Sequence, residues 1–90
     1  MAIDEFKYFV YVLMSEKDKR LYTGYTNCLE RRLKQHSEGL VKSTKNRRPL
    51  KLAYKEEFND KKQAMEREDF FKSGRGRSQL KELMARYPSG

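Results

Sequence analysis

The strongest hydrophobic pattern lies near the N-terminus, where residues 6–14 are F-K-Y-F-V-Y-V-L-M. Aromatic and β-branched side chains are typical of strands, and apolar residues on both faces predict a central strand that is covered on each side. The polar segment S-E-K-D-K-R separates this strand from a second apolar segment, L-Y-T-G-Y-T, at residues 21–26. So short a connection predicts that the two strands pair antiparallel as a hairpin.

A helix is expected after the hairpin. Asn27 has the residue type of an N-cap, and Glu30 three positions later completes a capping-box pattern. Gly39 is suited to end the helix, because many helices end with a glycine in the left-handed conformation. Residues 40–49, L-V-K-S-T-K-N-R-R-P, are polar and strongly basic, which predicts a loop.

A third strand is predicted at residues 50–58. In this segment Leu50, Leu52 and Tyr54 alternate with Lys51, Ala53 and Lys55. A period of two residues predicts that the three larger apolar side chains lie on one face of a sheet.

Two further helices are predicted in the C-terminal third. Asp60 and Gln63 form another capping pattern, and the helix they open is expected to reach Ser73, where Gly74 ends it. The segment G-R-G-R is then predicted to be a turn. A last amphipathic helix follows from apolar residues at i, i+3, i+4 and i+7, with a proline after them: Leu80, Leu83, Met84, Tyr87 and Pro88.

The predicted order is β-β-α-β-α-α, without a repeat or an interdomain linker. Ninety residues suffice for one domain, so residues 1–90 are expected to form a single unit with a core at about residues 6–87. The predicted fold is of the α/β class, α+β type: a small three-stranded, largely antiparallel sheet flanked by helices. The sequence does not indicate an oligomeric state.

The charge balance narrows the expected partners. Lys and Arg number 21 against 13 Asp and Glu, giving a net charge of +8, which attracts polyanions such as nucleic acids or anionic membrane surfaces. A purely solvating role for this charge is the alternative. The basic side chains expected to contact nucleic acid, unless they only solvate their loops, are Lys42, Lys45, Arg47, Arg48, Arg75 and Arg77.

Residue types that would indicate an exported or membrane-bound protein are scarce. Cys28 is the only cysteine, so an intrachain disulfide and a thiolate metal site are excluded. Asp4 and Glu5 argue against a signal peptide, and the apolar run at residues 8–14 is too short to span a bilayer. We therefore expect a cytoplasmic protein that does not bind membranes.

One carboxylate lies on an otherwise apolar helix face. Glu68 follows Ala64 by four positions and precedes Phe71 by three, so it projects from the apolar stripe. A carboxylate there needs a cation or a hydrogen-bond donor. A salt bridge to one of the many Lys or Arg residues is the structural alternative to a functional role.

Two pairs of polar side chains are expected to converge. Arg32 and His36 are spaced i, i+4, which points a permanent cation and a titratable imidazole in one direction. Tyr11 and Tyr22 lie on the paired strands, where two hydroxyls can meet over one face. The alternatives are that His36 interacts with the helix dipole and that the tyrosines are core residues.

Together these positions resemble the GIY-YIG nuclease domain, and the resemblance covers residues 6–73. The family's first motif matches Phe9-Val10-Tyr11, and its second matches Tyr22-Thr23-Gly24. Residues 26–36, T-N-C-L-E-R-R-L-K-Q-H, are similar to the following helix, which carries an arginine and in many members a histidine. Residues 64–68, A-M-E-R-E, resemble the segment that supplies a metal-binding glutamate. Within the family, the chain looks closest to small stand-alone bacterial proteins of poorly defined role.

The resemblance implies phosphodiester hydrolysis with one Mg²⁺ or Mn²⁺ ion held by Glu68. Arg32 would bind the phosphate, because its guanidinium is always charged and matches phosphate oxygens. Tyr11 would act as general base, provided that nearby cations stabilise its phenolate. Tyr22 would orient the water or the phosphate, and His36 would relay a proton or contact the phosphate.

The expected substrate is nucleic acid, with DNA as the favoured form. No base-recognising helix or zinc module is present, so recognition of a substrate structure, or targeting by a protein partner, is expected instead of sequence specificity. Phe9 replaces the first glycine of the motif, and Thr23 replaces an isoleucine. Phe9, together with the absence of a targeting domain, keeps open a non-catalytic nucleic-acid-binding protein on the same scaffold. The positive charge keeps open a module that binds a ribosomal or other acidic partner.

Overall fold

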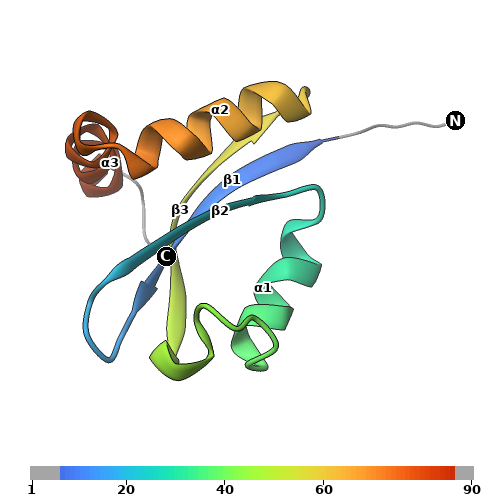
Figure 1. The fold of residues 1–90 in the computed structure, drawn as a ribbon, viewed down its shortest axis with the longest axis vertical. Coiled ribbons are helices and arrows are strands. Elements are labelled where there is room, and N and C mark those ends of the chain that lie inside the picture. Colours follow the sequence, from blue (N-terminus) through green and yellow to red (C-terminus); the bar gives the residue numbers. More distant parts are fainter. Residues whose placement is uncertain (1–6, 87–90) are drawn as a thin grey trace, which may run out of the picture.

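The computed structural model describes residues 7–86, which form a three-stranded sheet and three α-helices (Figure 1). Strands β1 (Tyr8–Ser15), β2 (Leu21–Thr26) and β3 (Leu50–Phe58) are arranged in the order β2-β1-β3. Helix α1 (Leu29–Ser37) lies on one side of the sheet, and α2 (Lys61–Lys72) lies on the other, followed by α3 (Gly74–Arg86). The predicted fold class and element order are confirmed.

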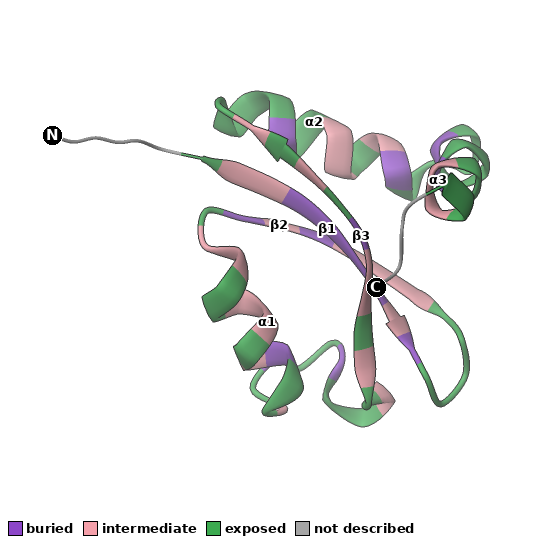
Figure 2. Ribbon diagram, turned by 180° about the vertical axis from the view of Figure 1, so that it is seen from behind, coloured by how far each residue is buried: buried purple, intermediate pink, exposed green. Residues whose placement is uncertain are grey.

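The central strand is the one that the hydrophobic pattern identified. β1 pairs antiparallel with both β2 and β3, and Val10, Tyr11, Val12 and Leu13 are all buried (Figure 2). A strand with neighbours on both edges and helices on both faces has no solvent-facing side, which explains its continuous apolar sequence. The antiparallel hairpin is confirmed.

A change of register in β3 alters the predicted faces. Val12 pairs with Tyr54, but its neighbour Leu13 pairs with Leu52, so one residue of β3 is passed over between them. This irregularity places Tyr54 with the valines of the core and Leu52 on the opposite face. The prediction that Leu50, Leu52 and Tyr54 share one face was therefore wrong, because strict alternation does not anticipate a bulge.

The hydrophobic core lies between the sheet and the helices α2 and α3. Tyr8, Leu21, Phe58, Leu83 and Met84 pack around it as partly buried residues. The buried members of this core come from β1, β3 and both helices: Val10, Val12, Tyr54, Ala64, Phe71 and Leu80. Helix α1, by contrast, has one buried residue, His36, and lies against the opposite face of the sheet.

An ion pair reinforces the contact between α2 and β3. Arg67 donates from Nε to Glu56 Oε1 at 2.8 Å and from Nη2 to Oε2 at 3.0 Å. Its guanidinium carbon lies 4.4 Å from the ring centroid of Phe71, and the hydroxyl of Tyr54 donates to Glu56 at 2.6 Å. A two-pronged pair of this kind fixes the position of the helix on the strand.

The start of α1 differs from the capping prediction. The N-cap is Cys28, which makes no side-chain capping hydrogen bond, and Asn27 instead accepts a hydrogen bond from Arg31 at 3.3 Å. The prediction that Gly39 ends the helix is confirmed. The C-cap is Glu38, and Gly39 follows it with a positive φ of 80°.

The boundary between α2 and α3 also differs. The N-cap Asp60 is confirmed, since its side chain accepts from the backbone N–H of Lys62. Gly74 was expected to end this helix and begin a turn, but it opens α3 instead, and the hydroxyl of Ser73 accepts from the N–H of Gly76. A Cβ on Gly76 would overlap the carbonyl oxygen of Phe70, so the helices approach closely only because this position is glycine.

The last predicted residues, Tyr87 and Pro88, lie outside the described residues. Within residues 7–86, no helix combines the length and the apolar character that crossing a membrane requires.

Candidate active site

The phenol of Tyr11 is the centre of a cluster of polar side chains. Its ring projects from β1 toward α1 and is completely buried. Its hydroxyl lies 2.9 Å from Nε2 of His36 and accepts a hydrogen bond of 3.3 Å from Nε of Arg32. The i, i+4 pair on α1 therefore converges on one oxygen atom, as its spacing predicted.

Glycine in the second motif makes room for this phenol. Gly24 is the cross-strand partner of Tyr11, and a Cβ built on Gly24 would lie 2.7 Å from the Tyr11 hydroxyl. Any side chain at this position would push the phenol away from His36. The close approach of the Tyr11 side chain thus explains why the third residue of the motif is glycine.

His36 connects Tyr11 to the segment that follows α1. Its Nδ1 lies 2.8 Å from the hydroxyl of Thr44, and both residues are buried. Arg32 can only donate, so the oxygen of Tyr11 accepts from Arg32 and its own proton is available to Nε2 of His36. The arrangement that satisfies all these groups places the imidazole proton on Nδ1, which then donates to Thr44.

The electrostatic surroundings keep both groups of this pair neutral. Burial, together with the charge of Arg32, lowers the pKa of His36 from 6.5 to about 4. Burial raises the pKa of Tyr11 above 10, and the hydrogen bond from Arg32 opposes this change only in part. Arg32 therefore favours the phenolate in the expected direction, but desolvation outweighs it. A neutral His36 at pH 7 is not a charged partner of the helix dipole.

Tyr22 completes the aromatic part of the cluster from the neighbouring strand. Its ring centroid lies 5.2 Å from that of His36 and 6.3 Å from that of Tyr11. The two tyrosines lie on the same sheet face, as the hairpin predicted, because Tyr22 pairs with Leu13, two residues beyond Tyr11. Unlike Tyr11, Tyr22 is only partly buried and so reaches the surface of the site.

Glu68 approaches the cluster from α2. Its negative charge contributes to the raised pKa of Tyr11, so the carboxylate lies within electrostatic range of the phenol. Its side chain is 15% exposed and forms an ion pair of 2.9 Å with Lys72, one turn later on the same helix. The hydrogen bond to Glu68 raises the pKa of Lys72. Glu68, a carboxylate on an apolar stripe, was expected to need a cation. In this structure Lys72 is that cation.

The side chains of the site are suited to a metal ion that keeps most of its bound water molecules. In residues 7–86, no group of three or more His, Cys, Asp or Glu side chains could enclose an ion. Mg²⁺ commonly uses one or two carboxylates together with waters and substrate phosphates. Glu68, whose side chain is 15% exposed and whose charge acts on Tyr11, fits this type of site.

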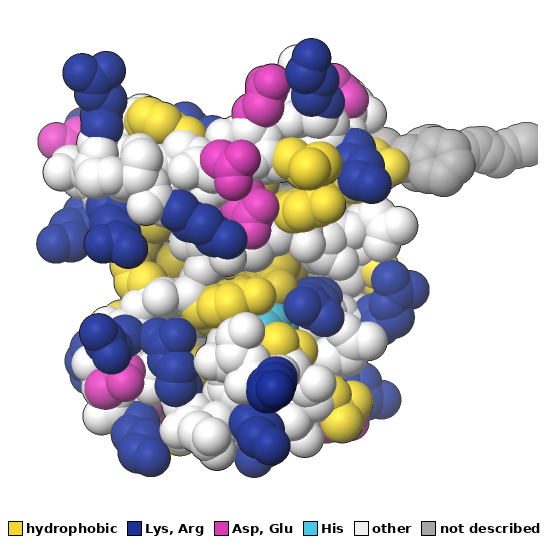
Figure 3. Space-filling model, in the orientation of Figure 1, with side chains coloured by type: hydrophobic (Ala, Val, Ile, Leu, Met, Phe, Trp, Pro, Cys, Tyr) yellow, Lys and Arg dark blue, Asp and Glu magenta, His cyan; other side chains and the backbone are white. Residues whose placement is uncertain are grey.

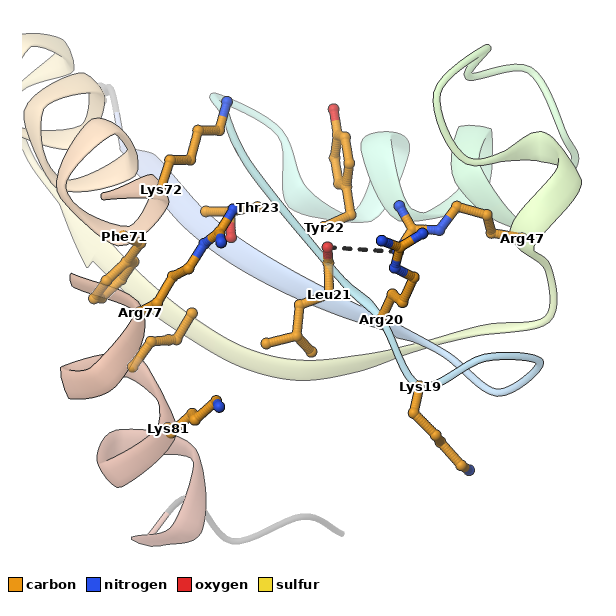
Figure 4. A pocket seen from close by; sticks show the side chains of 11 residues that line it. Lys19, Arg20, Leu21, Tyr22, Thr23, Arg47, Phe71, Lys72, Arg77 and Lys81 are labelled. Carbon is orange, nitrogen blue, oxygen red and sulfur yellow. Dashed lines mark hydrogen bonds between the residues drawn. The ribbon is translucent and has the colours of Figure 1, made fainter. Parts of the chain in front are cut away.

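The predicted basic residues fall into three groups. Arg47 and Arg77 line a cleft beside Tyr22, shown close up in Figure 4. Arg48 instead donates to the backbone carbonyls of Lys45 at 2.9 Å and Ser37 at 3.3 Å, a structural role in the loop. The remaining predicted residues are exposed at the surface: Lys42, Lys45 and Arg75. Figure 3 shows basic side chains on both sides of a hollow lined by hydrophobic ones.

Two residues of the site were not predicted from the sequence. Thr44, which orients His36, lies in a polar loop where no periodic pattern distinguishes it. Lys72 carried a usable signal, because Glu and Lys at i, i+4 on a helix commonly pair. The spacing of Glu68 and Lys72 would have been sufficient to find this ion pair.

The chain is similar to several known proteins. The family model described as the GIY-YIG catalytic domain matches residues 7–81. The UPF0213 protein of Clostridium perfringens is 48% identical over 65 residues, which are 71% of this chain and 69% of that protein. The UPF0213 protein of Staphylococcus haemolyticus is 42% identical over 81 residues, 89% of this chain and 98% of that protein. The solution NMR structure of the UPF0213 protein from Bacillus halodurans has a TM-score of 0.55 and 38% identity, covering 86% of this chain and 84% of that one.

Proposed function

Because this chain belongs to the GIY-YIG family, we propose that it is a metal-dependent endonuclease that hydrolyses phosphodiester bonds of nucleic acid, with DNA as the expected substrate. One observation carries the proposal: Arg32 and His36 both contact the hydroxyl of Tyr11, and the Glu68 carboxylate lies within electrostatic range of that hydroxyl. These four groups come from three separate elements, β1, α1 and α2.

Arg32 would bind and orient the scissile phosphate. Its Nε is occupied by Tyr11 and its Nη1 donates to Gln35 at 3.0 Å, which fixes the plane of the guanidinium. A guanidinium held in this way keeps its charge at neutral pH and can stabilise the negative charge that grows on the phosphate oxygens. Its hydrogen bond to Tyr11 raises the pKa of Arg32 further.

Tyr11 and His36 would together remove a proton from the attacking water. The water's proton passes to the Tyr11 oxygen as the Tyr11 proton moves to Nε2 of His36, so the imidazole is the final acceptor. Thr44 accepts from Nδ1 and so holds the imidazole in the tautomer whose unprotonated Nε2 faces the Tyr11 hydroxyl. A phosphate in the site favours a protonated imidazole, which offsets the low pKa of His36 in the free protein.

Glu68 would hold the metal ion. An Mg²⁺ or Mn²⁺ ion held there would supply positive charge to polarise the phosphate and to offset the charge of the leaving oxygen. Lys72 must release Glu68 before the carboxylate can act as a ligand, and the flexible side chain of Lys72 allows this movement. Tyr22, at the surface of the site, would hydrogen-bond to the phosphate or to the water.

The test is cleavage of branched, nicked and single-stranded DNA in Mg²⁺ or Mn²⁺ by the wild type and by Glu68→Gln. A matched control is Glu66→Gln, an exposed carboxylate on the same helix. We expect the first substitution to reduce cleavage at least about 100-fold and the second to leave it unchanged. Cleavage that persists in Glu68→Gln would remove this residue as the metal ligand.

A second candidate function is nucleic-acid binding without cleavage. Two observations favour it: Glu68 is already neutralised by Lys72, and Tyr11 is fully buried with a raised pKa. Under this proposal the protein binds the same DNA substrates but cuts none of them with either metal. The cleavage assay distinguishes the two functions directly.

A further inference from the structure

A basic cleft adjoins the candidate active site on the open side of β2. Its volume is about 730 Å³, and Leu21, Tyr22 and Thr23 of β2 form its floor (Figure 4). Tyr22 belongs both to this floor and to the cluster around Tyr11. The remaining lining residues are Lys19, Arg20, Arg47, Phe71, Lys72, Arg77, Leu80 and Lys81. We call this the basic cleft.

Six of the eleven lining residues are cations, and none is acidic. Figure 4 shows that the basic side chains approach from two sides: Arg20 and Arg47 from the hairpin and the loop before β3, and Lys72 and Arg77 from α2 and α3. Because basic side chains face one another from both sides of the cleft, the potential inside it is strongly positive. The occupant that this potential favours is a polyanion.

Asp18, Glu68 and Asp69 interact with residues of the basic cleft but do not line it. Asp18 is in the turn before Arg20, and its pKa is lowered mainly by the backbone N–H of Arg20 and to a lesser extent by the charges of Arg20 and Arg47. Glu68 pairs with Lys72. Arg20, Arg77 and Lys81 are exposed and available to an anion.

Arg47 is held weakly by the protein. Its Nη2 donates to the carbonyl oxygen of Leu21 over 3.5 Å, at the long limit of a hydrogen bond, and its buried Nε has no hydrogen-bond partner among residues 7–86. A guanidinium in this condition loses little by turning toward a phosphate. It would gain a charge-assisted hydrogen bond in exchange.

The size of the basic cleft selects among nucleic acids. A volume of 730 Å³ equals a cube roughly 9 Å on a side, whereas the major groove of a double helix alone is about 12 Å wide. A duplex is therefore expected to lie against the rim. A single strand can enter the cleft. Its phosphates would then face the basic side chains on the two sides, and a base would stack on the aromatic ring of Tyr22.

We propose that the basic cleft holds an unpaired nucleic-acid strand and delivers it past Tyr22 to the candidate active site. The substrate class is then nucleic acid with a single-stranded segment beside the cleavage point, an assignment that rests on the proposed nuclease function. Binding of the strand itself depends only on the basic cleft.

The test measures binding without cleavage. Fluorescence anisotropy with a short labelled oligothymidylate and with a short blunt duplex, both in EDTA, compares the wild type with Arg77→Gln/Lys81→Gln. The control Lys61→Gln/Lys62→Gln removes the same charge from exposed positions outside the basic cleft. All four residues are exposed, so the variants are expected to fold, which circular dichroism checks.

We expect the cleft variant to bind oligothymidylate at least about tenfold more weakly near 0.1 M salt, and its slope of log K against log salt to fall in magnitude by about 1.4. The control variant should stay within about twofold of the wild type, and the duplex should lose less affinity than the single strand. Arg20→Gln, on the opposite side of the basic cleft, should also lower the affinity for oligothymidylate.

Equal losses in the cleft and control variants would show that only the overall charge matters and would overturn the proposal. An equal loss for the duplex would overturn the assignment of a single strand. These outcomes are separate from the nuclease test: a protein that binds oligothymidylate in the basic cleft but never cuts refutes the proposed nuclease alone.

Discussion

The hydroxyl of Tyr11 lies 2.9 Å from Nε2 of His36, although 25 positions separate the two residues in the chain. This hydrogen bond joins the central strand to α1, whose only buried residue is His36. Thr44 extends the same connection to the loop before β3. The cluster proposed to perform catalysis therefore also holds α1 on the sheet, and its substitutions are expected to affect both stability and activity.

The first prediction concerns the dependence of stability on pH. In an unfolded chain His36 takes up a proton below pH 6.5, whereas in the folded protein it does so only below about pH 4. The unfolded state therefore binds more protons between these values, and stability falls as the pH decreases through this window. The full difference corresponds to roughly 3 kcal/mol, measurable by urea unfolding at pH 7.5 and pH 4.

The control for this prediction is His36→Asn, which removes the titrating imidazole. The variant should be less stable at pH 7.5, because it disturbs the contacts with Tyr11 and Thr44, but its stability should depend less on pH. The carboxylates contribute equally to both proteins and cancel in the comparison. The same pH dependence in both proteins would contradict the low pKa of His36.

The second prediction separates binding from turnover. In Tyr11→Phe the hydroxyl between Arg32 and His36 is lost, and the proton path is interrupted. We expect DNA affinity within about twofold of the wild type and a fall in cleavage rate of at least about 100-fold. Single-turnover assays at saturating DNA measure the rate, and Tyr22→Phe should have a smaller effect. Unchanged turnover in Tyr11→Phe would exclude the phenol from proton transfer.

The third prediction tests the glycine beside Tyr11. Gly24→Ala places a methyl group 2.7 Å from the Tyr11 hydroxyl, so the phenol must move away from His36. We expect a loss of about 1–3 kcal/mol in the free energy of unfolding. The matched control is Gly74→Ala, since a Cβ there meets nothing within 4 Å. Denaturant unfolding of the two variants should show the loss only for Gly24→Ala.

The fourth prediction concerns the ion pair that occupies Glu68. Lys72→Gln removes the cation 2.9 Å from the carboxylate, so the Mn²⁺ concentration for half-maximal cleavage should fall several-fold. Because Lys72 also lines the basic cleft, the titration is performed at saturating DNA. Lys62→Gln serves as the control on the same helix, and chelation of the metal should stop cleavage in every protein. An increased requirement for Mn²⁺ would contradict competition between Lys72 and the metal.

The fifth prediction concerns stability at a distance from the site. Arg67→Met keeps the packing of the side chain on Phe71 but removes both hydrogen bonds to Glu56. The paired side chains are 27% and 19% exposed, so this ion pair is intermediate between a surface pair and a buried pair. We therefore expect the free energy of unfolding to fall by about 1–2 kcal/mol. Thermal unfolding measures it. Addition of Glu56→Gln should restore part of the loss, since the unpaired carboxylate is then gone.

The secondary structure was largely predictable because local pattern determines it. The third strand was predicted within its observed bounds, Leu50–Phe58, and the antiparallel hairpin followed from the short polar connection. The GIY-YIG resemblance, based on motifs in both hairpin strands and two helices, is confirmed by the family match over residues 7–81. The spacing of Arg32 and His36 indicated their common direction, since i, i+4 neighbours share a helix face.

Apart from the N-cap of α1, the errors occur where one element meets another. The bulge that separates the faces of Leu52 and Tyr54 arises from pairing with β1, and the helical start at Gly74 depends on the close contact of Gly76 with α2. The role of Arg48 in holding loop carbonyls could not be distinguished from an anion-binding role by composition. Local propensity carries no information about which backbone groups approach from elsewhere in the chain.

The sequence by itself therefore determined the elements, their order, the family and the members of the candidate site, because hydrophobic period and residue spacing act over a few positions. Only the tertiary structure decided the partners of those members: Thr44 beside His36, Gly24 beneath Tyr11, and the basic cleft next to Tyr22. Such partners are set by distances between segments that are remote in the chain, and those distances exist only once the sheet and helices have packed.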